Sequence, residues 1–123
     1  MRRILIFDDD VDILDILKYL LNEKDWDVHT RGTCNNLLET VAECNPDIIL
    51  MDNWIPDTGG IIATQILKKH DQFKNIPVIY FSANNDIQSL AKEAGADRWL
   101  AKPFDLNDLE SMLESCTKKA SDS

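Results

Sequence analysis

Acidic residues are concentrated near the start of the chain. Asp8, Asp9 and Asp10 follow the apolar run at 4–7, and an apolar pattern with helical spacing resumes directly after them. Carboxylates gathered this closely repel one another, so either one of them takes up a proton or a divalent cation binds among them. Magnesium prefers such oxygen ligands, and a carboxylate can also attack a phosphoryl group to form an aspartyl phosphate.

A calcium site is one interpretation of the alternating aspartates. Asp8, Asp10 and Asp12 are spaced like the first ligands of an EF-hand loop. The sixth position of that loop needs glycine for its sharp turn, and here it is Ile13. The twelfth position needs a bidentate glutamate, and here it is Tyr19. The sequence therefore excludes an EF-hand.

Two other interpretations remain at this point. An apolar strand followed by Asp8 and Asp10 is similar to the opening of haloacid-dehalogenase-type phosphatases, in which Asp8 would be a covalent nucleophile. Alternatively, Asp8 and Asp9 only hold a metal while another residue carries out the chemistry. The rest of the chain must decide between the two.

Length and charge limit the possible classes of protein. With 123 residues and 44% hydrophobic content, the chain has the size of one domain with a single core. Its net charge of -9 would repel nucleic acid and anionic membranes. The apolar run at 4–7 is too short for a signal peptide, and no run reaches the length of a membrane span. We therefore expect a cytoplasmic protein with no direct nucleic-acid partner and no membrane partner.

The cysteines suggest neither a disulfide framework nor a zinc site. Cys34, Cys44 and Cys116 are odd in number and lack CxxC spacing. All three fall at apolar positions of expected helices. We expect buried free thiols, as in a reducing cytoplasm.

Five short apolar runs alternate with amphipathic segments along the chain. The runs are residues 4–7, 26–30, 47–51, 77–81 and 97–101. Apolar residues at helical spacing mark segments at 11–23, 37–44, 61–67, 87–94 and 106–116. The pattern predicts a strand followed by a helix, repeated five times.

The polarity of the runs predicts their places in the sheet. Runs 4–7, 47–51 and 77–81 are almost entirely apolar, as in central strands covered on both faces, whereas 26–30 and 97–101 suit edges. This distribution favours a flavodoxin-like, doubly wound, five-stranded parallel sheet of order 2-1-3-4-5 with five helices. Ligands of such folds bind where the strand order reverses, beyond strands 1 and 3. Asp8 and Asp52 follow those two strands.

Five polar residues share the carboxyl edge of this expected sheet: Asp8, Asp9, Asp52, Ser82 and Lys102. A single Ser or Lys in a loop is usually only solvated, and an Asp after a strand often caps a helix. Because all five follow strands of one parallel sheet, they would face one another. Such a set supports phosphoryl transfer: a lysine and a metal neutralise phosphoryl oxygens, and a hydroxyl donates a hydrogen bond to one of them.

The segments IFDDD, DIILMDNWIPDTGG, VIYFSA and WLAKPF, in this order and spacing, resemble the receiver domain of two-component response regulators. The resemblance covers residues 3 to about 117, so we expect a receiver domain at 1–117 and a flexible polar tail at 118–123. It implies the flavodoxin-like fold described above, which chemotaxis regulators of this family also have. It also implies a cytoplasmic phosphorelay module that accepts phosphate from a sensor histidine kinase or a histidine phosphotransfer protein.

The resemblance also implies a role for each residue of the site. Asp52 would accept the phosphoryl group, and Ser82 and Lys102 would contact it. Asp9, Asp52 and the backbone carbonyl of Trp54 would ligate Mg²⁺, with Asp8 reaching the ion through water.

A change of shape would follow phosphorylation. Ser82 and Trp99 would form the switch, and a downstream protein target would bind the face made by the fourth helix, fifth strand and fifth helix. Pro103 matches a Lys-Pro step that is commonly cis in the family. Asp10 is expected at the start of the first helix, where its charge favours the positive end of the helix dipole.

Some positions depart from the family pattern or lie outside it. Trp54 is bulky for its position beside the acceptor, and with Asn84 it would control how water reaches the phosphoryl group. Gly59 stands where the family often has Asp, which would loosen the loop. His29 and His70 fit no part of the site, and His70 suits a helix C-terminus.

The leading hypothesis is a phosphorylation-controlled binding module, not an enzyme in the usual sense, although it catalyses its own phosphoryl transfer and dephosphorylation. The phosphatase alternative is disfavoured because the chain is short, Asp12 replaces the Thr or Val of that motif, and Asp52 would have no role. A flavodoxin-like electron carrier is disfavoured because three aspartates stand where a phosphate-binding loop would follow the first strand.

Overall fold

The computed structural model describes residues 2–121, and the side chains of residues 2–117. Within this range five strands form one sheet: β1 (Arg2–Phe7), β2 (Trp26–Arg31), β3 (Ile48–Asp52), β4 (Val78–Ser82) and β5 (Arg98–Ala101). All neighbouring strands are parallel, and their order is β2-β1-β3-β4-β5. This confirms the predicted flavodoxin-like, doubly wound sheet, with the two more polar strands at its edges.

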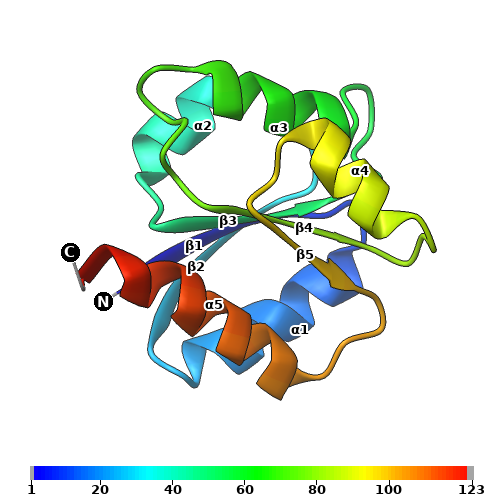
Figure 1. Cartoon of the computed structure of the whole chain (residues 1–123). Helices are drawn as coiled ribbons and strands as arrows, with labels where there is room; N and C mark the ends of the chain where they lie inside the picture. Colours follow the sequence, from blue (N-terminus) through cyan, green and yellow to red (C-terminus); the bar gives the residue numbers. More distant parts are fainter. Residues whose placement is uncertain (1, 122–123) are drawn as a thin grey trace.

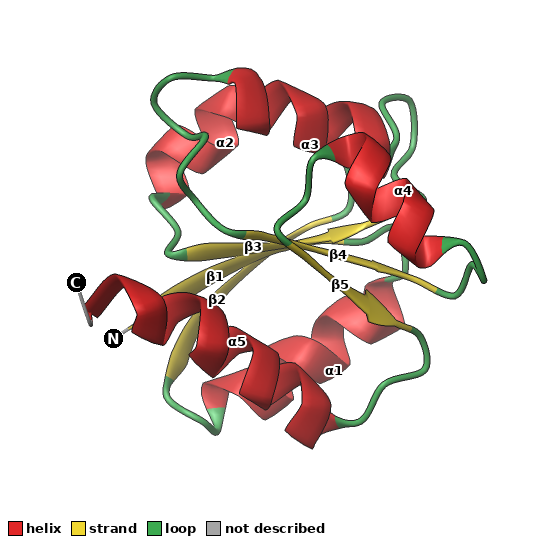
Figure 2. Ribbon diagram, viewed as in Figure 1, coloured by secondary structure: helices red, strands yellow, loops and turns green. Residues whose placement is uncertain are grey.

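Each strand is followed by one helix in the same part of the chain: α1 (Val11–Asn22), α2 (Leu37–Cys44), α3 (Gly60–Lys69), α4 (Ile87–Ala94) and α5 (Leu106–Ser121). Figure 1 and Figure 2 show α1 and α5 on one face of the sheet and α2, α3 and α4 on the other. Leu14, Leu17 and Leu21, at helical spacing, are the buried residues of α1.

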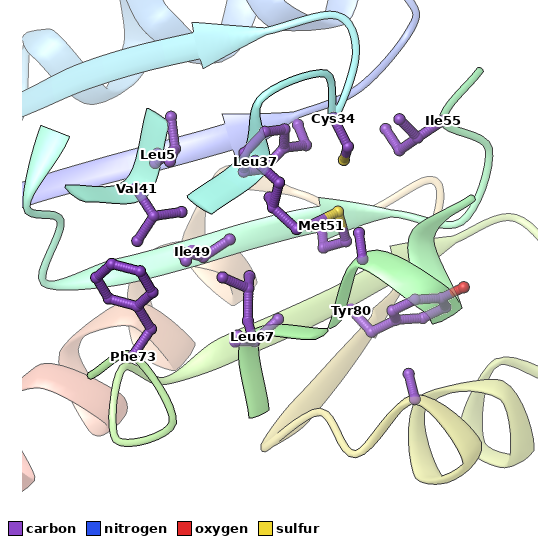
Figure 3. Close-up of a cluster of buried hydrophobic side chains, with 14 of the residues drawn as sticks. Leu5, Cys34, Leu37, Val41, Ile49, Met51, Ile55, Leu67, Phe73 and Tyr80 are labelled. Carbon is purple, nitrogen blue, oxygen red and sulfur yellow. The ribbon is translucent and has the colours of Figure 1, made fainter. Parts of the chain in front are cut away.

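The core has two layers because alternate residues of a strand point to opposite faces of the sheet. Leu5, Ile49 and Tyr80 belong to the cluster that packs under α2, α3 and α4, part of which is shown in Figure 3. Their neighbours Ile4 and Phe81 belong to the cluster that packs under α1 and α5. Every residue of β3 and β4 is buried, so the strands that carry the candidate site form a closely packed platform.

Two strands end one residue later than their apolar runs. Asp52 and Ser82 were expected just after strands, but they are the last residues of β3 and β4. Asp52 is in register with Phe81, and Ser82 with Ala101. The main-chain ladder continues past the last apolar side chain because backbone pairing does not depend on the polarity of the side chain.

The cysteines depart in part from their expected places. Cys44 is buried in α2, but Cys34 is buried in the loop before α2 rather than in a helix, and Cys116 in α5 is only half-buried. The prediction for Cys34 was wrong because a loop that packs against the core also needs apolar side chains. None of these three cysteines takes part in a disulfide.

The end of the chain is helical beyond the expected limit of the domain. Helix α5 continues to Ser121, past residue 117 where the receiver domain was expected to end. Of the expected tail at 118–123, residues 122–123 lie outside the described part of the chain. No helix within residues 2–121 combines the length and apolar character needed to cross a membrane.

Candidate functional site

The carboxyl ends of β1 and β3 meet where the strand order reverses, and three charged residues converge there. Asp8 follows β1 directly, Asp52 ends β3 and Lys102 follows β5. The Nζ atom of Lys102 donates hydrogen bonds to Asp8 Oδ2 and to Asp52 Oδ1, and the N–O distance is 3.0 Å in each. One ammonium group thus bridges two carboxylates from residues that are far apart in the sequence.

Both oxygens of Asp8 have partners within the protein. Oδ2 accepts a hydrogen bond from Lys102, and Oδ1 accepts one from the backbone N–H of Asp10 at a distance of 2.9 Å. Asp10 in turn caps α1, because its side chain accepts from the backbone N–H groups of Asp12 and Ile13. This confirms the expected place of Asp10 and ties the first loop of the site to the start of α1.

The carboxylate of Asp52 is held at both oxygens as well. Oδ1 accepts from Lys102, and Oδ2 accepts from the backbone N–H of Trp54 over 3.1 Å. The residue is only 4% exposed, although Trp54, two positions later, is 75% exposed. The carboxylate is therefore fixed in direction at the mouth of the site.

Burial and charge change the proton affinity of this cluster. Burial raises the pKa of Asp8 above its ordinary value of 3.8, and hydrogen bonds from Asp10 and Lys102 only partly oppose the rise. Burial also raises the pKa of Asp52, assisted by the negative charge of Asp8 and opposed by Lys102. Burial alone would lower the pKa of Lys102, but its hydrogen bonds to Asp52 and Asp8 outweigh this effect and raise the pKa. The lysine is therefore held in its charged form at neutral pH, and three carboxylates lie close to this one cation.

A metal ion fits this surplus of negative charge. Asp8, Asp9 and Asp52 each offer a carboxylate oxygen within 4.8 Å of the others. Asp9 is exposed, while Asp8 and Asp52 are buried. Hard oxygen donors in a small, partly open cluster suit magnesium, which keeps several waters and uses one or two carboxylates. Because both oxygens of Asp8 and both oxygens of Asp52 already have protein partners, the exposed Asp9 is the carboxylate best placed for direct ligation.

Ser82 is joined to this cluster by a main-chain hydrogen bond to Lys102. Its carbonyl accepts from the backbone N–H of Lys102 over 2.9 Å, and its hydroxyl oxygen accepts from the backbone N–H of Asn84 over 3.0 Å. The hydroxyl proton is then available to an acceptor in the site. The peptide bond between Lys102 and Pro103 is cis, as the resemblance implied.

The aromatic ring of Phe81 lies against the ammonium group of Lys102. Lys102 Nζ lies 4.4 Å from the centre of this ring, close enough for a cation–π interaction. The Phe81 ring also meets the edge of the Phe104 ring, with centroids 6.1 Å apart. Sequence reasoning missed this role because Phe81 lies in an apolar run that predicts only a core position.

An apolar groove of about 400 Å³ opens beside Lys102. It lies between α1 and the segment that joins β5 to α5, and its lining includes Ile13, Ile16, Leu20, Pro103, Phe104 and Leu106. Ile16 and Tyr19 of α1 are 57% and 66% exposed. The surface next to the cluster is therefore apolar although the chain as a whole is strongly acidic.

Two further contacts in the segment that joins β3 to α3 were not predicted. Asn53 Oδ1 accepts a hydrogen bond from the Tyr80 hydroxyl. Gly60 starts α3 against the end of β3, where a Cβ would overlap the carbonyl oxygen of Asp52. A glycine pair after an apolar strand is the one sequence signal that pointed to such a close approach.

The remaining predicted residues lie outside the cluster. Trp99 on β5 is 43% exposed and is in register with Tyr80. His70 is the C-cap of α3, which confirms its expected place at a helix C-terminus, and its ring stacks on Phe73. His29 lies on β2, and its Nε2 atom is 3.3 Å from Oδ1 of Asp27.

Comparison with known proteins gives a consistent result over nearly the whole chain. The family model described as the response regulator receiver domain matches residues 4–114. The receiver domain of Francisella response regulator 1452 has the same fold, with a TM-score of 0.87 and 28% identity, covering 98% of this chain and 99% of that one.

Curated relatives contain this domain within longer chains. The chain is 31% identical over 107 residues to the CAI-1 autoinducer sensor kinase/phosphatase CqsS of Vibrio cholerae, which covers 85% of this chain and 16% of that protein. It is 28% identical over 123 residues to the DNA-binding response regulator MtrA of Mycobacterium tuberculosis, covering 98% and 53%. The chain thus spans about half the length of MtrA. Because MtrA is named as DNA-binding, the relatives do not support the expectation of no nucleic-acid partner.

Proposed function

Because the chain belongs to the response regulator receiver domain family, we propose that it accepts a phosphoryl group on Asp52 from a phosphohistidine. Receiver domains are signalling modules of two-component systems and are generally not classed as enzymes. The donor would be a sensor histidine kinase or a histidine phosphotransfer protein. The observation that carries the proposal is the Lys102 ammonium group shared between Asp8 and Asp52 at the point where the strand order reverses.

The transfer is a displacement at phosphorus. An oxygen of Asp52 attacks the phosphorus atom, the P–N bond breaks, and its electron pair stays on the ring nitrogen. A donor ring protonated at its other nitrogen then leaves as neutral imidazole. Lys102, already held against Asp52, offsets negative charge on the phosphoryl oxygens, and the Ser82 hydroxyl donates a hydrogen bond to one of them.

Asp9, Asp52 and the backbone carbonyl of Trp54 would hold magnesium, with Asp8 reaching it through water. The exposed carboxylate of Asp9 supports its place as a direct ligand. A bound magnesium ion would neutralise further charge on the phosphoryl oxygens. Dephosphorylation by the domain itself would follow when water attacks the phosphorus, and access of that water would depend on Trp54 and Asn84.

The donor would dock on the groove between α1 and the segment joining β5 to α5. This groove is continuous with the site, since Lys102 and Ala83 are among its lining residues. A phosphohistidine on a helix whose apolar face covers Ile16 would reach Asp52 from this side. An apolar surface suits an acidic chain here because it avoids charge repulsion with the partner.

The phosphoryl signal would leave the domain through Ser82 and Trp99. The phosphoryl group brings roughly two negative charges to Asp52. Ser82 would turn toward it and give up its contact with Asn84, and Trp99 would rotate inward from its exposed position. The face formed by α4, β5 and α5 would then have one shape with the phosphoryl group and another without it. A downstream protein target that binds one of these shapes more tightly would shift the population toward it.

The extent and setting of the domain are part of the same proposal. Residues 1–117 would form the receiver domain, working in the cytoplasm where the donor is. The described range contains no helix suited to crossing a membrane, which agrees with this setting.

Labelling by acetyl phosphate with magnesium tests the proposal, with intact mass as the readout. Wild type should gain one phosphoryl group, and Asp52→Asn should gain none. Asp57→Asn, which removes an exposed carboxylate from the following loop, is the matched control and should label like wild type. Labelling of Asp52→Asn at the wild-type level, with loss only in Asp8→Asn, would instead favour the phosphatase-like assignment.

A further inference from the structure

The buried hydroxyl of Tyr80 is bonded to the residue that follows the proposed acceptor. Tyr80 is fully buried in β4, within the cluster that packs under α3 and α4. Its hydroxyl donates to Asn53 Oδ1. Figure 3 shows this oxygen at the end of the cluster opposite Phe73. A buried tyrosine hydroxyl needs a polar partner, and here the partner comes from the acceptor loop.

Asn53 is held by its main chain as well as by its side chain. Its N–H donates to the carbonyl of Phe81 over 3.2 Å, and its carbonyl accepts from the N–H of Gly60 over 3.1 Å. The residue is therefore attached to β4 twice and to the start of α3 once. Since Asn53 lies between Asp52 and Trp54, these attachments set the direction of the next peptide group along the chain.

The Trp54 residue that follows has two roles at the site. Its N–H donates to Asp52 Oδ2 over 3.1 Å, and under the proposed function, on which this step rests, its carbonyl is a magnesium ligand. The Trp54 side chain is 75% exposed, so little packing of that side chain fixes its backbone. Orientation of the residue therefore depends on its backbone hydrogen bond to Asp52 and on its two chain neighbours, Asn53 on one side and the buried Ile55 on the other.

We propose that Tyr80 and Asn53 form a positioning pair that orients the backbone of Trp54 for magnesium binding. Neither side chain touches the metal or the phosphoryl group in this account. They act through the main chain, as groups behind metal ligands commonly do.

Tyr80→Phe removes only the hydroxyl and keeps the ring that fills the core. Magnesium affinity, followed by tryptophan fluorescence, should fall about tenfold, the lower end of the range for groups that orient metal ligands. In the metal-free protein, the backbone amide of Trp54 should exchange its hydrogen faster. Tyr19→Phe is the matched control, since Tyr19 is the other tyrosine of the chain and is exposed on α1.

A double-mutant cycle separates positioning from general destabilisation. Asn53→Ala combined with Tyr80→Phe should bind magnesium no more weakly than the weaker single variant, because the two substitutions break one contact. A Tyr80→Phe affinity within about twofold of wild type would overturn the inference while leaving the proposed function intact, as would additive losses. Failure of wild type to bind magnesium or to be labelled at Asp52 would instead overturn the proposed function together with the inference.

Discussion

Gly60 begins α3 so close to Asp52 that the Cβ of any other residue would overlap the carbonyl oxygen of Asp52. The same hypothetical Cβ would lie 3.1 Å from the Cα of Asn53. Neither neighbour is a flexible side-chain end, so the main chain of the acceptor loop would have to move. The glycine is therefore part of the site although it contributes no functional group.

Gly60→Ala should lower the free energy of unfolding by about 2 kcal/mol or more, because the backbone on both sides of the contact is fixed by packing. Urea unfolding measures this. Gly32→Ala is the control: a Cβ there would lie 3.9 Å from the carbonyl oxygen of Asp8, an ordinary contact. Equal stability of the two variants would contradict the close approach.

The proposed acceptor should destabilise the metal-free protein at neutral pH. Burial raises the pKa of Asp52 above 3.8, so proton uptake favours the folded state, and this contribution is lost as the pH rises through the folded-state pKa. Asp52→Asn, which stays neutral, should then gain about 1 kcal/mol of unfolding free energy at pH 7. The gain should shrink as the pH falls toward 3.8.

Thermal unfolding between pH 4 and 8 without magnesium checks this pH dependence, with exposed Asp15→Asn as the control. A gain of the same size at every pH would show that charge at Asp52 is not its source. Added magnesium should remove most of the gain, because it stabilises wild type by binding the ionised carboxylates.

Donor docking on α1 can be separated from the chemistry. Ile16→Glu places a charge on the groove and should slow phosphotransfer from a histidine-phosphorylated protein by about tenfold. Labelling by acetyl phosphate, which needs no docking surface, should be unchanged. Ile62→Glu is the matched control, because Ile62 is 50% exposed on α3, on the other face of the sheet. Equal slowing in both variants would argue against the groove.

The lifetime of the phosphorylated form should depend on Trp54. The backbone of Trp54 contacts Asp52, and if its indole ring limits the approach of water, replacing it with alanine should speed hydrolysis several-fold. Asn84→Ala should act in the same direction, and Asn85→Ala serves as the control. Decay of the phosphoryl group after removal of the donor gives the rate. An unchanged rate in both Trp54→Ala and Asn84→Ala would remove these residues from the account.

The proposed switch predicts a change at Trp99. With a beryllium fluoride mimic on Asp52, the Ser82 hydroxyl should leave Asn84, and the exposed fraction of Trp99 should fall below its present 43%. A structure with the mimic measures both. If the two side chains keep their rotamers while affinity for a downstream target still changes, the signal travels by another route.

The strand order and the convergence of Asp8, Asp52 and Lys102 could be predicted because they depend on short-range patterns. Apolar runs separated by helical periods define a parallel sheet, and the ends of its strands must share an edge. The cap at Asp10 followed from the same logic. These features need only the types of nearby residues.

The support behind the site could not be predicted in the same way. Tyr80 and Phe81 both lie in an apolar run, and the register of β4 with β3 and with β5 decides that Tyr80 meets Asn53 and that Phe81 meets Lys102. Cys34 was misplaced because a buried loop and a helix can have the same local composition. Contacts of this kind depend on distances that a one-dimensional pattern does not contain.

Asp52 is buried and Trp54 is exposed, so the stability of the fold and the lifetime of the phosphorylated form would depend on different residues. Asp52 belongs to a strand with no exposed residue, so changes there that alter the volume of a side chain disturb the packing. Trp54 faces solvent, where substitutions usually alter stability by less than about 0.5 kcal/mol. Under the proposed function, the duration of the signal could therefore evolve in small steps on the rim of the site, without loss of stability in the strands beneath it.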